Sequence, residues 1–294
     1  MPNLKDIRSR IDTVKNTSQI TRAMKMVSAA KLRRAQLQIV NMRPYAKTLL
    51  QMIADIAVTQ RVTHPLMLQH PEVKKVLLVV LTSDRGLCGA FNTNINKFAE
   101  TYYRDNQKKF EAVDFLFIGR RGADYFGRRQ IKAKDVILKL DKDVSYALAT
   151  KVAGRLMKQY LEGDYDEIRI IYNEFKSALQ QNVVSETLLP VDSINQTFDA
   201  SPEAKLFAKD MIFEPPPEEV IEKLLLKHFS LQVYRCMCES VAAEHGARMT
   251  SMENATNNAK AMVDGLTLTY NKLRQASITT ELIEITSGAE ALKG

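Results

Sequence analysis

Apolar residues recur at steps of three and four positions near both ends of the chain. The first arm follows this spacing through Leu4, Ile7, Ile11 and Val14, and then through the polar Ser18 and Thr21. The last arm follows it at Leu231, Tyr234, Cys238 and Val241, and again at Ala255, Ala259, Met262, Leu266, Thr269, Leu273 and Ala276. Such spacing is typical of a coiled-coil seam. Two seams at opposite ends predict that the arms pair antiparallel with each other; the alternative is that each stripe packs on the middle of the chain.

Glycine and proline, which interrupt helices, are absent from long stretches at both ends. The first glycine is Gly86, and no proline occurs from Glu218 to Gly294. Uninterrupted helices of about 60 and about 75 residues span about 90 and about 110 Å. Pro44 is the exception in the first arm, where we expect it to bend the helix or break it locally.

The middle of the chain has a different pattern, in which short apolar runs alternate with loops that contain glycine. The predicted strands are Lys74 to Thr82, Val113 to Ile118 and Glu167 to Tyr172. Strands with little in/out alternation are usually buried on both faces, as in a parallel sheet covered by helices. The sequence therefore predicts an α/β fold, with a long antiparallel α-helical coiled coil formed by the two arms and an inserted, doubly wound, Rossmann-like domain. We place the N-terminal helix at residues 1–62, the α/β domain at 72–205 and the C-terminal helix at 206–294.

Positive charge is concentrated in the first arm. Residues 1–60 hold eleven Lys and Arg and three Asp, a net charge of +8. This equals the net charge of the whole chain, so the remaining residues are balanced in charge. This imbalance favours a basic rod that faces an acidic partner, either nucleic acid or protein, over an ordinary solvated helix face.

The sequence also indicates the cellular compartment in which the protein works. The longest apolar run, Val76 to Leu81, is far shorter than the roughly 20 residues that span a bilayer, so we expect no membrane insertion. The N-terminus lacks the pattern of a signal or transit peptide, and three cysteines fit a reducing compartment. We therefore expect function in the cytoplasm.

Two glycine-containing loops follow predicted strands, where an enzyme of this fold would bind its ligand. They are Ser83 to Gly89 and Gly119 to Gly122, and neither contains a complete phosphate-binding or dinucleotide-binding motif. The four histidines are scattered, and Cys88 is expected to be a small buried apolar residue rather than a nucleophile. We therefore expect no catalytic, cofactor or metal site in this chain.

Three separated stretches carry motifs specific to one family. The first comprises Ile7 to Ile11, Val14 to Thr17, Ile20 to Val27 and Lys31 to Gln36. The second is Ser83 to Asn92, and the third comprises Ala247 to Met249, Asn254 to Thr256, Asn258, Tyr270 to Ile285, Gly288 and Ala289. In this order they closely resemble the gamma subunit of F-type ATP synthases of the bacterial type, and the resemblance covers essentially the entire chain.

The resemblance implies a rotor shaft. In that family the terminal helices form an antiparallel coiled coil inside a hexamer of alternating alpha and beta subunits, and proton flow turns a membrane ring that turns the shaft. The shaft opens and closes the catalytic sites in sequence, so that rotation is coupled to ATP synthesis, or ATP hydrolysis to proton pumping. The expected place is one copy per complex, peripheral at the cytoplasmic face of the bacterial inner membrane.

The resemblance also implies roles for single residues. Beta-subunit contacts are expected at Met24, Lys25, Arg33, Arg34, Arg274, Gln275, Thr279 and Glu281. The C-terminal tip from Ile283 onward is expected in the apolar bearing at the far end of the hexamer.

The foot of the shaft matches the family less closely. Residues 201–217 occupy the place that rests on the membrane ring and binds the epsilon subunit, and many relatives carry tyrosines where Met211 and Phe213 stand. We expect Phe213 and Glu214 to contact the ring. The central domain holds only Cys88, so thiol regulation of the kind found in plastid relatives is not expected.

Two other functions stay open on the residues alone. A basic coiled coil that clamps DNA would bind with a steep salt dependence, but its basic residues are interleaved with the seam and no residues stand out for reading bases. A nucleotide-binding enzyme built on the α/β domain would bind ATP as an isolated chain. We expect neither nucleic acid nor nucleotide as a partner.

Overall fold

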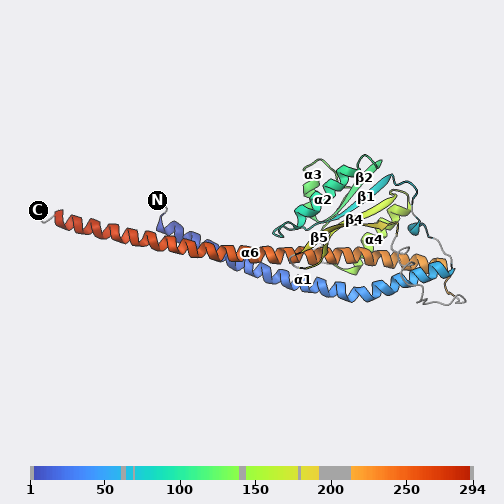
Figure 1. Ribbon diagram of the computed structural model, residues 1–294, viewed down its shortest axis with the longest axis horizontal. Helices are drawn as coiled ribbons and strands as arrows, with labels where there is room; N and C mark the ends of the chain where they lie inside the picture. Colours follow the sequence, from blue (N-terminus) through green and yellow to red (C-terminus); the bar gives the residue numbers. More distant parts are fainter. Residues whose placement is uncertain are drawn as a thin grey trace. The chain divides into compact units, whose positions relative to one another are not determined.

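A computed structural model describes residues 3–60, 64–68, 70–138, 144–177, 180–191 and 213–291 (Figure 1). The chain divides into two compact units. One unit comprises Met1–Ser28 with Met249–Gly294, and the other comprises Ala29–Arg248. The three domain ranges derived from the sequence stay a prediction.

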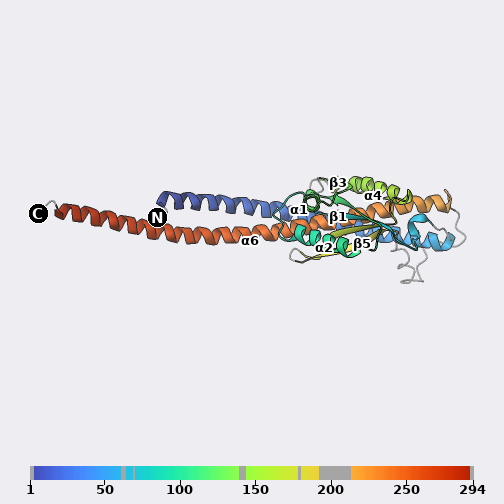
Figure 2. The same cartoon turned by 90° about the horizontal axis from the view of Figure 1, so that it is seen from above.

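The first unit consists of parts of two long helices, α1 (Leu4–Gln60) and α6 (Pro217–Ala291), which run side by side in Figures 1 and 2. The Thr21 and Thr256 hydroxyls lie 2.8 Å apart, and Lys25 Nζ lies 2.6 Å from Glu253 Oε1. Residue numbers rise along α1 as they fall along α6, so the pair is antiparallel, as predicted.

The covered face of α1 keeps the predicted spacing as far as Ile56. The buried positions on this face are Ile7, Ile11, Thr21, Ser28, Leu32, Ala35, Ile39, Met42, Leu49, Ile53 and Ile56. They lie on one stripe of alternating three- and four-residue steps, the geometry of a coiled-coil seam, and Ala54, which is also buried, lies beside this stripe. The polar Thr21 and Ser28 occupy seam positions, as the sequence indicated for Thr21.

The predicted seam of α6 is wrong at three positions. Met262 is 56% exposed, and Thr269 and Ala276 are exposed as well. The covered stripe instead passes through Met252, Thr256, Ala259, Val263, Leu266, Tyr270, Leu273 and Ser277. From Ala259, a step of three residues leads to Met262 and a step of four leads to Val263, and both steps fit a coiled-coil seam. The structure takes the step of four, which turns Val263 and Tyr270 toward the partner helix.

Pro44 does not break α1. The helix is continuous from Leu4 to Gln60 with Pro44 inside it, and Figure 1 draws this part as a curved, unbroken ribbon. Pro44 is exposed, while Met42 and Leu49 on either side remain buried in the seam. The seam contacts therefore hold the helix together across the hydrogen bond that proline cannot donate.

The second unit contains a sheet of five strands in the order β3-β2-β1-β4-β5. The strands are β1 (Lys75–Leu81), β2 (Ala112–Ile118), β3 (Asp135–Ile137), β4 (Glu167–Phe175) and β5 (Gln181–Leu189). Neighbours pair in parallel except β4 and β5, which are antiparallel. This strand order matches that of a doubly wound sheet, as predicted.

Helices cover both faces of this sheet. Figures 1 and 2 place α2 (Phe91–Asn106) and α4 (Tyr146–Leu161) on opposite faces, and the short α3 (Arg120–Gly127) packs beside α2. Val76, Leu78 and Val80 of β1 join the core formed with α2 and α3. The alternate β1 residues are buried on the other face, which explains the absence of polar alternation in the sequence.

Two strands were not predicted from the sequence. β3 has only three residues, fewer than a periodicity can define, and β5 mixes polar and apolar residues because most of its side chains are partly exposed. A single 3-10 turn, η1 (Pro65–Met67), lies between α1 and the sheet, and its Leu66 carbonyl accepts a hydrogen bond from the Val191 amide.

Gly119 is required where β2 passes into α3. Its φ is +114°, and a Cβ atom there would lie 2.1 Å from the Thr82 carbonyl oxygen. Gly119→Ala is expected to lower the free energy of unfolding by at least about 2 kcal/mol, measured by urea denaturation followed by circular dichroism. The matched control is Gly127→Ala, where the added methyl meets no atom within 4 Å. Equal stability of the two variants would contradict this interpretation.

Candidate functional site

Met24 and Lys25, which the resemblance links to the beta subunits, lie in the helical pair of the first unit. Lys25 occupies a seam position and forms an ion pair with Glu253 at 2.6 Å, with the two side chains 37% and 48% exposed. Met24 is partly buried beside it. An exposed pair of this kind contributes about 0–1 kcal/mol, so Lys25 can exchange Glu253 for an acidic partner at little cost.

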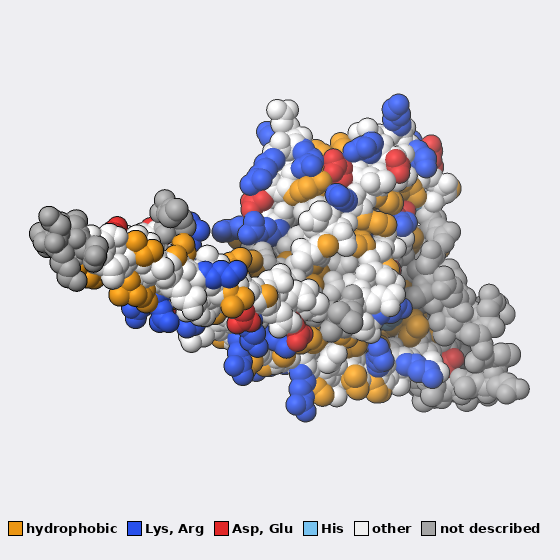
Figure 3. Space-filling view, turned by 60° about the vertical axis from the view of Figure 1, so that its left-hand side comes forward, with side chains coloured by type: hydrophobic (Ala, Val, Ile, Leu, Met, Phe, Trp, Pro, Cys, Tyr) orange, Lys and Arg blue, Asp and Glu red, His pale blue; other side chains and the backbone are white. Residues whose placement is uncertain are grey.

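Arg33 and Arg34 lie on the part of α1 that belongs to the second unit. Both are exposed, whereas Leu32 and Ala35 on either side of them are buried in the seam. Figure 3 shows many Lys and Arg side chains, with few Asp or Glu among them, on the helical part of the visible face. The two arginines therefore point away from the partner helix and are available to another molecule.

Arg274, Gln275, Thr279 and Glu281 are all exposed on the last part of α6. Their hydrogen bonds are local: the Thr279 hydroxyl donates to the Gln275 carbonyl at 2.9 Å, and Ser277 donates to Glu281 at 3.3 Å. The structure thus places all four on the same helical segment, with their side chains directed to solvent.

The same segment exposes large apolar side chains beyond the end of the seam. Every described residue from Ile278 to Ala289 is exposed, and the large apolar ones are Ile278, Leu282, Ile283 and Ile285. Single exposed apolar residues are ordinary, but several on one helix end indicate a surface that another molecule covers.

The predicted foot lies largely outside the described residues. Residues 201–212, including Met211, are among those not described. Phe213 is partly buried and Glu214 is exposed just before α6, whose first turn carries Glu218 and Glu219. Acidic residues at this end stabilise a helix through its dipole.

The loop that follows β1 is held by its own polar side chains. Asn92 accepts a hydrogen bond from the Ser83 amide at 3.0 Å and donates to Cys88 Sγ at 3.2 Å. Cys88 is buried, and this burial raises the pKa of its thiol, while a hydrogen bond with Ser83 acts in the opposite direction. A buried thiol with a raised pKa is a poor nucleophile, as expected from the sequence.

Arg248 of α6 occupies the carboxyl edge of the sheet next to this loop. Its Nη2 atom lies 2.6 Å from Glu244 Oε1 and 3.2 Å from the Gly86 carbonyl oxygen, and it also reaches the Arg85 carbonyl oxygen at 3.5 Å. The Arg248 and Glu244 side chains are only 7% and 4% exposed. A guanidinium group of the chain itself therefore fills the place where doubly wound sheets bind ligands.

No role for Arg248 was predicted from the sequence beyond its place in the Ala247 to Met249 motif. A Glu and an Arg four residues apart in a largely apolar stretch are nevertheless a recognisable signal of an ion pair.

Arg248→Ala is expected to lower the free energy of unfolding by about 3–5 kcal/mol, because it removes the cation from a buried ion pair and leaves the Glu244 carboxylate without its counter-charge. Lys25→Ala removes the cation from the exposed Lys25–Glu253 pair and is expected to cost less than about 1 kcal/mol. Urea denaturation of both variants measures the difference. Similar losses in the two would show that burial of the Arg248 pair has no special weight.

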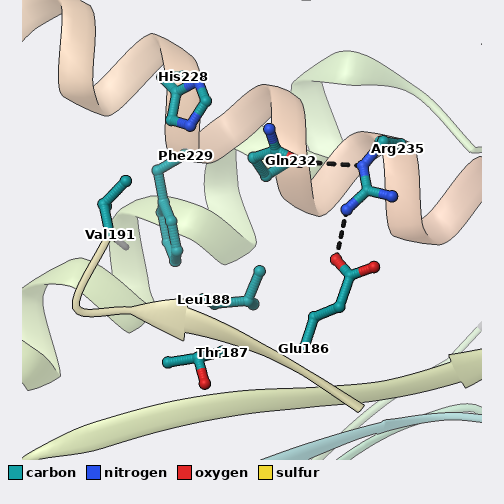
Figure 4. A pocket seen from close by; sticks show the side chains of 8 residues that line it. All are labelled: Glu186, Thr187, Leu188, Val191, His228, Phe229, Gln232 and Arg235. Atoms are coloured by element: carbon teal, nitrogen blue, oxygen red, sulfur yellow. Dashed lines mark hydrogen bonds and ion pairs between the residues drawn. The ribbon is translucent and has the colours of Figure 1, made fainter. Parts of the chain in front are cut away.

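A cavity of about 280 Å³ lies between β5 and α6 in the second unit (Figure 4). Its lining residues are Glu186, Thr187, Leu188, Val191, His228, Phe229, Gln232 and Arg235. His228 is 1% exposed, and neither ring nitrogen has a hydrogen-bond partner among the residues that the structure describes. Burial, with a smaller effect of the Arg235 charge, lowers the pKa of His228 to about 4. In the sequence, this histidine is one of four scattered ones, and no local pattern indicates its burial.

The folded state thus favours neutral His228, whose pKa in the unfolded chain is the ordinary 6.5. Its contribution to stability is complete above pH 6.5 and is lost as the pH falls toward 4. Relative to His228→Phe, the wild-type chain is expected to lose about 2–3 kcal/mol between pH 7.5 and pH 4.5. Urea denaturation at both pH values checks this, and a difference between the two proteins that does not change with pH would refute it.

The described residues contain no group of three or more His, Cys, Asp or Glu that could hold a metal ion. None of the described helices has an apolar stretch long enough to cross a bilayer.

Comparison with known proteins identifies the family. The ATP synthase family model matches residues 3–292. The chain is 69% identical to the ATP synthase gamma chain of Bdellovibrio bacteriovorus and 46% identical to that of a Geobacter species, with all of each chain covered.

Solved structures agree with this. The central stalk and c-ring structure of Tetrahymena thermophila mitochondrial ATP synthase contains a chain that matches with a TM-score of 0.60 at 27% identity, covering 80% of this chain and 99% of that one. A chain of the Euglena gracilis mitochondrial ATP synthase has the same fold, with a TM-score of 0.67 at 21% identity over 98% of this chain and 94% of that one. The resemblance found in the sequence and the predicted fold class are thereby confirmed, and the chain belongs to the ATP synthase gamma chain family.

Proposed function

We propose that this chain is the central rotor shaft of an F-type ATP synthase. It mechanically couples proton-driven rotation of the membrane ring to ATP synthesis, or ATP hydrolysis to proton pumping, at catalytic sites on the beta subunits. The observation that carries the proposal is the end of α6, which continues past its seam with α1 as a single helix whose apolar residues are exposed. A helix end of this kind needs a surrounding partner, and a ring of subunits supplies one.

The shaft has no active site of its own. The Arg248 guanidinium fills the edge of the sheet where an enzyme of this architecture would bind a ligand, and the nearby Cys88 thiol is buried. The chain thus acts on the chemistry only by moving the subunits that perform it.

The family resemblance, together with the exposure of most of these side chains, supports the following contacts. Met24 and Lys25 contact acidic loops of the beta subunits, Arg33 and Arg34 extend this basic face, and the exposed set Arg274, Gln275, Thr279 and Glu281 contacts the loop that grips the shaft. Phe213 and Glu214 contact the membrane ring, and the epsilon subunit binds at the foot. One copy of the chain serves one hexamer, at the cytoplasmic face of the bacterial inner membrane, and is held there through its partners.

Weak contacts suit this role. Exposed ion pairs contribute about 0–1 kcal/mol each and are screened by salt, so a basic face can favour one orientation without locking it. One proton crossing 100 mV yields about 2.3 kcal/mol, so several translocation steps must be summed through a stiff connection.

Reconstitution of the purified chain with alpha and beta subunits tests the proposal. The expected product is a complex with three alpha and three beta subunits per chain and a multi-site ATPase activity that the subunits lack without it. A chain that stays free and binds duplex DNA with a steep salt dependence would contradict the proposal and favour the nucleic-acid function.

Replacing both Arg33 and Arg34 by alanine tests the basic face. Because each exposed contact is weak, the complex is expected to assemble with unchanged stoichiometry, while its torque or its coupling of hydrolysis to pumping falls. Single-molecule rotation and proton-pumping assays measure the two quantities. Values equal to those of the wild-type complex would exclude a mechanical role for these two side chains.

A further inference from the structure

Arg235 joins α6 to the sheet within the second unit. Its guanidinium forms an ion pair with Glu186 of β5 and donates from Nη1 to the Tyr172 hydroxyl of β4 at 3.0 Å. On its own helix it donates to Gln232 at 2.9 Å and lies 3.5 Å from Glu239. Figure 4 shows the bonds to Gln232 and Glu186 at one end of the cavity. One side chain thus binds two strands and a helix.

The groups on the strands also bind each other. The Tyr172 hydroxyl donates to Glu186 Oε1 at 2.7 Å, which closes a ring of hydrogen bonds among Arg235, Glu186 and Tyr172. Tyr172 is fully buried, and this burial raises the pKa of its hydroxyl above the ordinary value. Charge-assisted bonds of this kind are directional, so the ring tolerates little rotation of α6 relative to β4 and β5.

Arg248 makes a second connection from α6 to the same domain, through the backbone carbonyls of Arg85 and Gly86. The two arginines are 13 residues apart on α6, which is about 20 Å along a helix. One connection would leave the domain able to pivot on the helix. Two connections at this separation fix both its position and its orientation.

Apolar packing between the same elements adds adhesion. Ala243 of α6 is buried in the core of the sheet, and Ala247 packs against that core. Small side chains such as these allow close approach but fix rotation weakly, because the attraction between apolar surfaces has no preferred direction. The arginines therefore supply directional hydrogen bonds, which the apolar contact lacks.

We propose that Arg235, together with Arg248, locks the α/β domain to α6, so that the domain turns with this helix as one body. The proposal rests on the proposed function as a shaft, and it makes Arg235 a positioning residue that transmits rotation between the domain and the helix. Arg235 does this through the closed ring of hydrogen bonds that it forms with Glu186 and Tyr172.

The test uses the whole ATP synthase complex in inverted membrane vesicles, with the wild-type chain or a variant. Arg235→Met keeps an apolar stem and removes the cation. ATP hydrolysis is expected to stay within about twofold of wild type, while protons pumped per ATP hydrolysed fall by about threefold or more, because removing one partner of a charge pair also leaves the other without its counter-charge.

Two further variants act on the same ring. Tyr172→Phe removes one hydroxyl, and Glu186→Gln removes one charge with little change of shape, so each is expected to lower the pumping ratio less than Arg235→Met does. If the complex with Arg235→Met does not assemble, the pumping ratios of Tyr172→Phe and Glu186→Gln show whether the ring transmits rotation. The matched control is Arg129→Met, which removes a cation from the partly exposed pair of Arg129, just after α3, with Glu100 of α2, and is expected to leave the ratio unchanged.

Hydrogen exchange of the β5 amides in the same complexes separates positioning from stability. Faster exchange with an unchanged pumping ratio in the ring variants would show a structural role only and overturn the proposal, as would wild-type behaviour of Arg235→Met. If the wild-type chain itself supports neither assembly nor hydrolysis, the proposed function fails instead.

Discussion

The burial of a narrow apolar stripe between two long helices is the constraint on which the rest of the structure depends. A helix as long as α6 draws little stability from its own hydrogen bonds in water and relies on the packing of its apolar face. The seam with α1 meets this need over successive turns, and it continues through Pro44 because the seam residues on both sides stay buried. The inserted sheet begins only after the first helix has ended.

The environment of α6 changes along its length, and its composition follows. Between Phe229 and Gly246 nearly every residue is buried or partly buried, since this segment packs within the unit that contains the sheet. From Met252 to Ser277 only one stripe is covered, and from Ile278 onward all described residues to Ala289 are exposed. A single helix thus serves as a core element, as half of a coiled coil and as a free end.

The long-range features were predictable from the sequence because they depend on repetition. The seam of α1, the three central strands and the absence of helix breakers each extend over several residues, so their patterns are clear. The phase of the α6 seam was not predictable. Met262 and Val263 both satisfy the spacing, and only the position of the partner helix decides which of them is covered. β3 and β5 lie at the sheet edges, where short length and partial exposure remove the pattern.

Single polar side chains in the interior were the hardest to predict. Arg248, Arg235 and His228 lie on one helix, and nothing in its periodicity shows which of them face the sheet. Their roles depend on residues distant in sequence, such as Gly86 and Glu186, that the fold brings to them. For the exposed residues of α1 and α6, the family resemblance supplied roles that spacing alone does not give.

The position of Arg248 has a consequence for a protein that works among nucleotides. Because the guanidinium is attached to the same chain as the carbonyl groups it binds, it acts as a tethered ligand, with an effective concentration on the order of millimolar or more. A nucleotide approaching the edge of the sheet would have to displace it and expose Glu244 at the same time. The chain's own arginine thus occupies carbonyl groups that a diffusing hydrogen-bond donor, such as the amino group of a nucleotide base, would otherwise bind.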